Sequence, residues 1–239
     1  MANIIELKDI NFSAQHGKVL SNVSINFAEG KTTAVVGPSG GGKSTVLKIS
    51  AGILVPDDGE ALYKNKDISH MNRAENLLFR RETAFVFQSS ALWANQNIFQ
   101  ILELPLRIHF PHMSGKDRFK RIKEVVNEVG YRRDLDIRPS RLSMGEQKLI
   151  AFARALLCKP SLLFLDEWTE SLDKTGSRRL IDIVKQMQSE GFTIICISHD
   201  IKLVLELADH VIIIIDGKVS LKAPKDDIKD DLSDLLRKG

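Results

Sequence analysis

The sequence predicts an α/β fold in which helices cover a mostly parallel sheet, with an antiparallel β edge and an inserted α-helical subdomain. Short apolar runs rich in β-branched residues alternate with longer segments of helical periodicity. A continuous apolar run is typical of a strand that is buried on both faces, as in a parallel sheet. The composition is 43% hydrophobic and 27% charged over 239 residues, which excludes a disordered or fibrous chain.

The expected strands fall into two groups. The buried sheet is expected from the apolar runs at residues 33–36, 84–87, 162–165, 193–197 and 211–215. Residues 4–7 and 19–27 differ, because apolar and polar side chains partly alternate there. Alternation is typical of a strand with one solvated face, so these two segments are expected to be antiparallel strands at an edge.

A helical insert is predicted in the middle of the chain. Residues 119–129 carry apolar side chains at helical spacing, and Gly130 follows where the helix should stop. We therefore divide the chain into a β edge with the first part of the core (1–88), a helical subdomain (89–158), a second part of the core (159–224) and a C-terminal tail (225–239). The tail is expected to be a short amphipathic helix or a frayed end.

Charge and hydropathy exclude several classes of protein. A net charge of +3 is too small for a nucleic-acid-binding surface, so no nucleic-acid partner is expected. Cys158 and Cys196 lie in apolar contexts and are expected to be buried thiols in a reducing compartment. No run approaches the roughly 18–20 apolar residues that span a bilayer, and the first residues lack a secretory pattern. Any membrane role is expected to come through a partner.

A phosphate-binding loop is predicted directly after the strand at 33–36. Residues 37–45 read GPSGGGKST and fit the pattern G-x-x-x-x-G-K-[ST]. Glycines let several backbone N–H groups point at one phosphate, and the following helix adds its dipole. Lys43 is expected to reach the β- and γ-phosphates, and Ser44 to bind Mg²⁺. The expected nucleotide-binding residues are Gly37, Pro38, Ser39, Gly40, Gly41, Gly42, Lys43, Ser44 and Thr45.

Two carboxylates end the buried strand at 162–165 and complement this loop. Asp166 stands at the tip of the strand and is expected to hold Mg²⁺ directly or through water. Glu167 follows it and is expected to polarise the water that attacks the γ-phosphorus. An acidic pair after an apolar run is usually only a solvated strand end. Beside a phosphate-binding loop it is better explained as a metal ligand and a base.

Four further elements occur in a fixed order along the chain. Gln88 follows the strand at 84–87, residues 142–146 read LSMGE, residues 171–173 read SLD, and His199 follows the strand at 193–197. With the two elements above, they resemble the Q-loop, signature, D-loop and switch histidine of the nucleotide-binding subunits of ABC transporters. The resemblance covers nearly the whole chain and implies a P-loop NTPase with a RecA-like core.

The resemblance implies an ATPase in which two copies of the chain enclose two ATP molecules, each with Mg²⁺. Its implied catalytic residues are Lys43, Gln88, Glu167 and His199, and its implied metal ligands are Ser44, Gln88 and Asp166. Ser143 and Gly145 of one copy would bind the γ-phosphate of the ATP held by the other. Independently of the family, Ser143 and Glu146 form an S-x-x-E pattern, which predicts a capping box at the start of a helix.

The sequence departs from the family pattern at Met144, Glu146, Trp168 and Glu170. Met144 replaces the first glycine of the signature and is expected either to crowd the helix N-terminus or to pack beside it. The position of the usual adenine-stacking aromatic is Ala14, so Phe12 or His16 is expected to substitute, or the base to bind weakly. None of these changes removes a catalytic group, so hydrolysis is still expected.

Residues 87–107 contain the elements FQSxAL, NxF and PLR, which resemble the ATPases of MCE-type lipid transporters. That resemblance implies a polytopic permease and a single-span MCE protein as partners, at the cytoplasmic face of the inner membrane. Trp93, Phe99 and Leu102 are expected to line the permease groove or to be ordinary core. An ATPase of a lipoprotein-release or cell-division permease is the alternative. A binding-only subunit also stays open, whereas action on ribosomes or DNA is disfavoured by the weak charge.

Overall fold

A computed structural model describes residues 2–15 and 17–228. Its larger sheet has six strands in the order β10-β9-β3-β8-β7-β6. The strands are β3 (Thr32–Val36), β6 (Thr83–Val86), β7 (Leu162–Asp166), β8 (Thr193–Ile197), β9 (His210–Ile215) and β10 (Lys218–Pro224). The first five run parallel to their neighbours, and β10 is antiparallel to β9. The prediction of a mostly parallel sheet is confirmed.

The expected antiparallel edge is a separate four-stranded sheet, in the order β2-β1-β4-β5. Its strands are β1 (Asn3–Ala14), β2 (Gly17–Ala28), β4 (Asp58–Tyr63) and β5 (Lys66–Asp67), all antiparallel to their neighbours. The two sheets meet where the backbone N–H of Ser21 donates to the carbonyl of Gly217 at 2.9 Å. Sequence analysis found β1 and β2 but missed β4 and β5.

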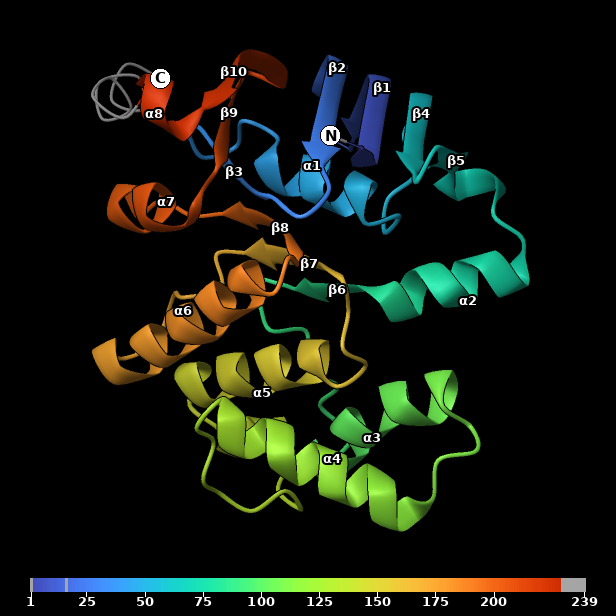
Figure 1. The fold of residues 1–239 in the computed structure, drawn as a ribbon, viewed down its shortest axis with the longest axis vertical. Helices are drawn as coiled ribbons and strands as arrows, with labels where there is room; N and C mark the ends of the chain where they lie inside the picture. The colour runs from blue at the N-terminus through green and yellow to red at the C-terminus, as the bar shows by residue number, and fades with distance from the viewer. Residues whose placement is uncertain (1, 16, 229–239) are drawn as a thin grey trace.

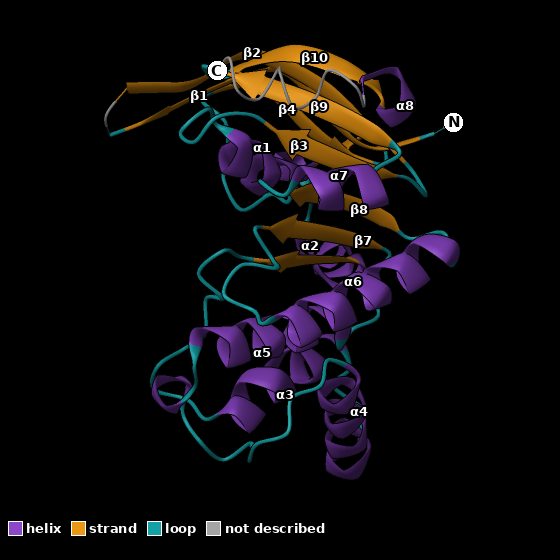
Figure 2. Cartoon of the chain, turned by 90° about the vertical axis from the view of Figure 1, so that its left-hand side faces the viewer, coloured by secondary structure: helices purple, strands orange, loops and turns teal. Residues whose placement is uncertain are grey.

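The helices cover the six-stranded sheet and form a separate helical region (Figure 1). They are α1 (Lys43–Ser50), α2 (Arg73–Glu82), α3 (Ile98–His109), α4 (Gly115–Glu128), α5 (Met144–Leu156), α6 (Lys174–Ser189), α7 (Ile201–Leu207) and α8 (Lys225–Ile228). Two 3₁₀ helices complete the described elements, η1 (Ile68–His70) and η2 (Pro139–Arg141). Helices α3, α4 and α5 follow β6 in the chain and gather at the end of the molecule away from the antiparallel sheet (Figure 2).

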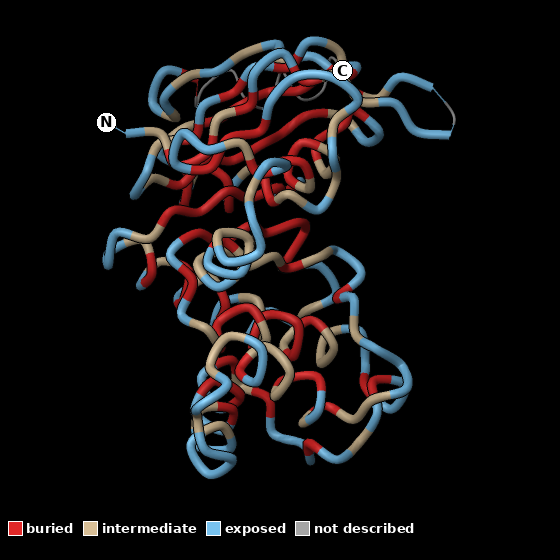
Figure 3. The backbone as a smooth tube through the Cα atoms, turned by 90° about the vertical axis from the view of Figure 1, so that its right-hand side faces the viewer, coloured by how far each residue is buried: buried red, intermediate tan, exposed pale blue. Residues whose placement is uncertain are grey.

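Two buried clusters of side chains hold these layers together, and the strands divide their residues between them. Leu163 and Leu165 of β7 belong to the cluster shared with the helical region, whereas Leu162 and Phe164 belong to the cluster shared with the antiparallel sheet. Successive side chains of a strand point to opposite faces. A strand between two cores must therefore be apolar at every position. For this reason the continuous apolar runs form the strands, and the central strands are buried (Figure 3).

The structure tests the three side chains that were expected to line the permease groove. Leu102 is fully buried in the helical core, so for this residue the ordinary-core alternative is confirmed and the groove is not. Phe99 is half-buried against the same core. Trp93 is 46% exposed and is the one of the three that lies at the surface. Spacing along a helix does not reveal which face a neighbouring helix covers, and here α4 and α5 pack on α3.

Several other expectations concern single residues. Cys196 is buried, Cys158 is half-buried, and both thiols are free. Trp168 fills the helical core, and its ring centroid lies 5.7 Å from that of Phe152.

Of the expected tail helix only α8 is described, and residues 229–239 lie outside the described residues. Within residues 2–15 and 17–228, no helix is both long and apolar enough to cross a membrane.

Candidate functional site

The predicted phosphate-binding loop joins the end of β3 to the start of α1. Gly37, Gly40 and Gly42 have φ values of +143°, +78° and +97°, where side chains are disfavoured. A Cβ atom on Gly37 would lie 2.0 Å from the carbonyl oxygen of Ile214 in β9. A cavity of about 170 Å³ lies beside the loop and is lined by Val19, Gly40, Gly42, Lys43, Ser44 and Thr45. The glycines therefore let the loop pass close to β9 and leave an open cradle.

We expect Gly37→Ala to weaken nucleotide binding by about tenfold or more, because the added methyl group pushes the loop away from β9 and costs about 1–2 kcal/mol of backbone strain. Titration with a fluorescent ATP analogue measures this. Gly115→Ala is the matched control, since a Cβ there meets nothing nearer than 3.9 Å. Equal affinity of both variants and the unmodified protein would contradict the loop assignment.

Lys43 and Ser44 are the first two residues of α1, and Ser44 contacts the end of β7. The Lys43 ammonium group donates to the carbonyls of Gly37 at 2.9 Å and Pro38 at 2.7 Å. Burial lowers the pKa of Lys43, while the charges of Glu167 and Asp166 oppose that shift. The Ser44 hydroxyl donates to Asp166 Oδ1 at 3.1 Å. Loop and strand thus bring one hydroxyl and one carboxylate together, an oxygen set that suits Mg²⁺, which usually takes few protein ligands.

The two carboxylates stand at the end of β7, both buried. Burial raises the pKa of Asp166, against the hydrogen bond from Ser44. Glu167 adopts φ +46°, and its backbone N–H donates to the carbonyl of Ile197 at 3.2 Å. Burial also raises the pKa of Glu167, and the carboxylate of Glu170 adds to this. The strand end therefore holds a carboxylate whose proton affinity is higher than usual, as a general base requires.

His199 follows β8 and meets Glu167. Its Nε2 atom lies 3.1 Å from Glu167 Oε1, and among the described residues that oxygen has no aligned hydrogen bond. The contact is thus a charge pair when the imidazole is protonated. The His199 charge lowers the pKa of Glu167 and opposes the effect of burial. The neighbouring parallel strands β7 and β8 bring this pair together from positions far apart in the sequence.

Gln88 lies just past β6. Among the described residues, its side chain forms no hydrogen bond with Ser44 or Asp166. Gln88 Nε2 donates instead to Glu170 Oε2 at 3.1 Å. Glu170 is one of the departures from the family pattern, so this contact is specific to the acidic residue found here. The expected role of Gln88 as a metal ligand stays a prediction.

The signature segment begins α5 as expected. The Ser143 hydroxyl accepts from the N–H of Glu146 at 3.2 Å, and the Glu146 carboxylate accepts from the N–H of Ser143 at 2.8 Å. This is the predicted capping box. Met144 is 71% exposed at the first position of α5, and whether it crowds the helix end or packs beside it stays a prediction. A Cβ on Gly145 would lie 2.8 Å from the carbonyl oxygen of Ser171, so the signature helix touches the D-loop of its own chain.

The expected adenine platform is only partly described. Ala14 is exposed at the end of β1, and Phe12 is half-buried against the core between the two sheets. His16 lies outside the described residues. Val19 is the apolar side chain that lines the cavity beside the phosphate-binding loop. Sequence reasoning did not single out Val19, since an aliphatic residue in a strand carries no chemical signal.

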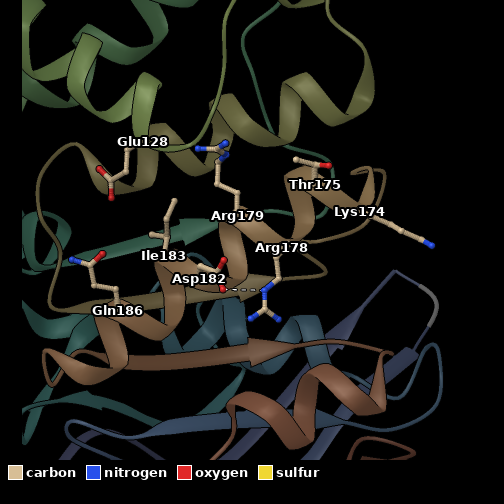
Figure 4. A pocket seen from close by; sticks show the side chains of 8 residues that line it. All are labelled: Glu128, Lys174, Thr175, Arg178, Arg179, Asp182, Ile183 and Gln186. Carbon is tan, nitrogen blue, oxygen red and sulfur yellow. Dashed lines mark ion pairs between the residues drawn. The ribbon is translucent and has the colours of Figure 1, made fainter.

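A larger cavity, of about 680 Å³, lies over α6 (Figure 4). It is lined by Glu128, Lys174, Thr175, Arg178, Arg179, Asp182, Ile183 and Gln186. Arg178 Nε lies 3.1 Å from Asp182, and its guanidinium also bonds Glu206 at 3.2 Å. Two carboxylates thus offset this charge, and none of the predicted site residues lines the cavity. We therefore place the candidate site at the phosphate-binding loop.

Lys148 is a site residue that sequence reasoning missed. Its ammonium group is buried beneath Gln88 and Glu167 and donates to their backbone carbonyls. A signal was available, because Lys148 stands three, four and seven residues before Ala151, Phe152 and Ala155, which lie on the buried face of α5. A lysine near a helix start is nevertheless usually exposed, and that expectation outweighed the spacing.

The sequence of this chain is similar to those of known proteins. Residues 20–170 match the sequence profile of the ABC transporter family. The chain is 32% identical over 220 residues to the intermembrane phospholipid transport system ATP-binding protein MlaF of Escherichia coli (strain K12), covering 92% of this chain and 81% of that protein. It is 36% identical over 218 residues to the putative ABC transporter ATP-binding protein PH0132 of Pyrococcus horikoshii, covering 90% and 82%.

Solved structures agree with these sequence relationships. The dimeric post-hydrolysis state of the ATP-binding cassette MJ0796 bound to ADP and Pi superposes with a TM-score of 0.85 at 29% identity, covering 92% of this chain and 98% of that one. A second dimeric structure of MJ0796 gives a TM-score of 0.84 at 30% identity, with the same coverage. The similarity extends over both sheets and the helical region, since it includes nearly the whole chain.

Proposed function

This chain belongs to the ABC transporter family as an ATP-binding subunit, and from that premise we propose that it hydrolyses ATP to energise a phospholipid transporter. ATP hydrolysis is supported above all by two pairs of side chains that lie close together at the ends of the parallel strands. Ser44 reaches Asp166 at 3.1 Å, and His199 reaches Glu167 at 3.1 Å. A phosphate-binding loop, a set of oxygen ligands and a base are the parts that phosphoryl transfer to water needs.

Each residue takes a role that follows from its place. The loop N–H groups and Lys43 hold the β- and γ-phosphates. When ATP binds, the Lys43 ammonium group exchanges two neutral carbonyl acceptors for charged phosphate oxygens, which form stronger hydrogen bonds with it. Ser44 and Asp166 are the residues that would hold Mg²⁺, which neutralises charge developing on the phosphates. Glu167 accepts the proton of the attacking water, while His199, which pairs with Glu167 when protonated, donates toward the γ-phosphate. Gln88 connects this site to the helical region.

We propose that the working form is a homodimer. Ser143 and Gly145 stand at the N-terminus of α5, where unpaired N–H groups and the helix dipole favour an anion. Among the described residues, no hydrogen bond joins these two to the phosphate-binding loop of their own chain. A second copy facing the first would bring this helix end to the γ-phosphate. The solved relative is described as dimeric and bound to ADP and Pi, which supports this arrangement.

Phospholipid transport is the finer part of the proposal. It is supported by the name of the MlaF relatives of Escherichia coli and Haemophilus influenzae, at 32% and 33% identity. We propose a polytopic permease and a single-span MCE protein as partners, a position at the cytoplasmic face of the inner membrane, and no nucleic-acid partner. The division at residues 88, 158 and 224 is retained as a proposal, with residues 88–110 as the part that contacts the permease.

We expect Trp93→Asp to reduce co-purification of the permease from gently solubilised native membranes by about tenfold or more, because a charge replaces an exposed aromatic anchor. Trp93 is 46% exposed, beside the Arg154 guanidinium. Phe119→Asp is the matched control, since Phe119 is 49% exposed on α4. Mass spectrometry of the co-purified proteins and lipids measures both.

The identity of the co-purified proteins tests transport itself. A permease with an MCE protein and phospholipid is the expected result. A permease with a lipoprotein-release or division partner would move the chain to that alternative. Recovery of no membrane protein with the unmodified chain would contradict a transport role. Equal loss in Trp93→Asp and Phe119→Asp would show that Trp93 is not the docking residue.

A further inference from the structure

Lys148 is a buried cation at the junction of three segments. It lies in α5, five residues after the Ser143 cap, and is 2% exposed. Its ammonium group donates to the carbonyls of Phe87 at 3.2 Å, Gln88 at 2.6 Å and Glu167 at 3.3 Å. A lysine ammonium has three N–H donors, and these three carbonyls occupy all of them. One side chain thus ties the signature helix to the ends of β6 and β7.

Packing alone does not require a lysine at this place. Moving a cation out of water costs several kcal/mol unless partners compensate, and an apolar side chain of similar volume often fits such sites as well. Burial lowers the pKa of Lys148, and the carboxylates of Glu170, Asp166 and Glu167 oppose the shift. These acidic groups favour the charged form, but burial has the larger effect on the pKa. What the lysine provides beyond packing is the fixed position of three backbone carbonyls.

Two of those carbonyls belong to residues with predicted catalytic side chains. We propose that Lys148 is a positioning residue that couples the signature helix to Gln88 and Glu167, an inference that rests on the proposed ATPase function. Ser143 and Lys148 are about 7.5 Å apart along the axis of α5, so a displacement of the helix start moves the ammonium group. The backbone of Gln88 and Glu167 then moves with it, and engagement of the helix by the second copy's nucleotide aligns the base.

Arg154 offers an internal comparison on the same helix. Its guanidinium donates to the carbonyls of Ser90 at 3.1 Å and Ala91 at 2.7 Å. Both cations therefore anchor the loop that follows β6. Lys148 alone of the two holds the carbonyls of Gln88 and Glu167 in the described structure. If anchoring the loop were the whole purpose, loss of either cation would have the same consequence.

The test compares Lys148→Met with Arg154→Met in the full-length chain. Misplacing a catalytic group by about 1 Å costs about a hundredfold in rate. We expect Lys148→Met to lower kcat for ATP hydrolysis at least about tenfold, with KM for ATP changed less than about threefold. Arg154→Met should keep kcat within about threefold of the unmodified protein. Lys148→Gln, which keeps an amide donor in less volume, serves if the methionine variant does not fold.

Hydrogen exchange measured by mass spectrometry provides a readout independent of turnover. With ATP and Mg²⁺, the Glu167→Gln variant with Lys148 intact should gain protection at residues 143–147 and at residues 87–91 together. Adding Lys148→Met should keep the first gain and lose the second. Equal kcat values in the Lys148 and Arg154 variants, or joint protection that survives Lys148→Met, would overturn the coupling. No hydrolysis by the unmodified chain would instead overturn the proposed function.

Discussion

Replacing Glu167 by glutamine is expected to trap the protein as an ATP-bound dimer with twice the monomer mass. Glutamine keeps the size of the side chain but cannot accept a proton from water. Loss of a general base lowers a rate by about 10²–10⁴-fold. ATP binding at the loop and at the facing signature helix is preserved, because neither Lys43 nor Ser143 changes. Light scattering with saturating ATP and Mg²⁺ measures the mass, and phosphate release measures the rate.

Glu190→Gln is the control for this experiment, since Glu190 is an exposed carboxylate at the end of α6. It should hydrolyse ATP at the unmodified rate and show no trapped dimer. A Glu167→Gln protein that hydrolyses ATP normally would remove Glu167 from the role of base and reopen the assignment of the acidic pair. If the variant stays monomeric in ATP, the dimer proposal for the isolated chain is wrong. Abolished hydrolysis also excludes the binding-only alternative, because the unmodified chain must then be an active ATPase.

Lys43→Ala is expected to lose nucleotide-dependent activity by about a hundredfold or more, because it removes the charge nearest the β- and γ-phosphates. Removal of one preorganised donor from a reacting oxyanion costs about 10²–10³-fold in rate. The fold should survive, because burial lowers the pKa of Lys43 and therefore disfavours its charge in the folded chain, so removing that charge also removes an unfavourable contribution. We expect the melting temperature to fall by less than about 5 °C. Phosphate release and thermal unfolding measure the two effects separately.

Lys116→Ala is the matched control, because Lys116 is an exposed lysine in α4, in the helical region. It should leave both the rate and the melting temperature unchanged. Hydrolysis at the normal rate in Lys43→Ala would mean that residues 37–45 are not the phosphate-binding loop. A large drop in melting temperature for Lys43→Ala would show that its bonds to Gly37 and Pro38 stabilise the loop more than its burial costs.

The strands that carry the site were predicted from the chain itself, and for a definite reason. A strand between two cores is apolar at every position, as Leu162 to Leu165 are. The phosphate-binding loop was equally readable, because glycines at 37, 40 and 42 are needed for backbone conformations that few other residues adopt. The capping box of Ser143 and Glu146 is local too, so four residues suffice to predict it.

Contacts between distant segments were not readable, and they decide how the site is held. The amide of Gln88 meets Glu170 across 82 positions of the chain, and Lys148 reaches back 60 positions to the carbonyl of Gln88. Trp93 and Leu102 looked alike as apolar candidates, yet one is exposed and the other buried. Sequence patterns report the period of a local element and the conformations its residues allow. Only the folded chain brings distant elements together. Those elements decide which face of a helix is buried and which backbone carbonyls a buried charge such as Lys148 contacts.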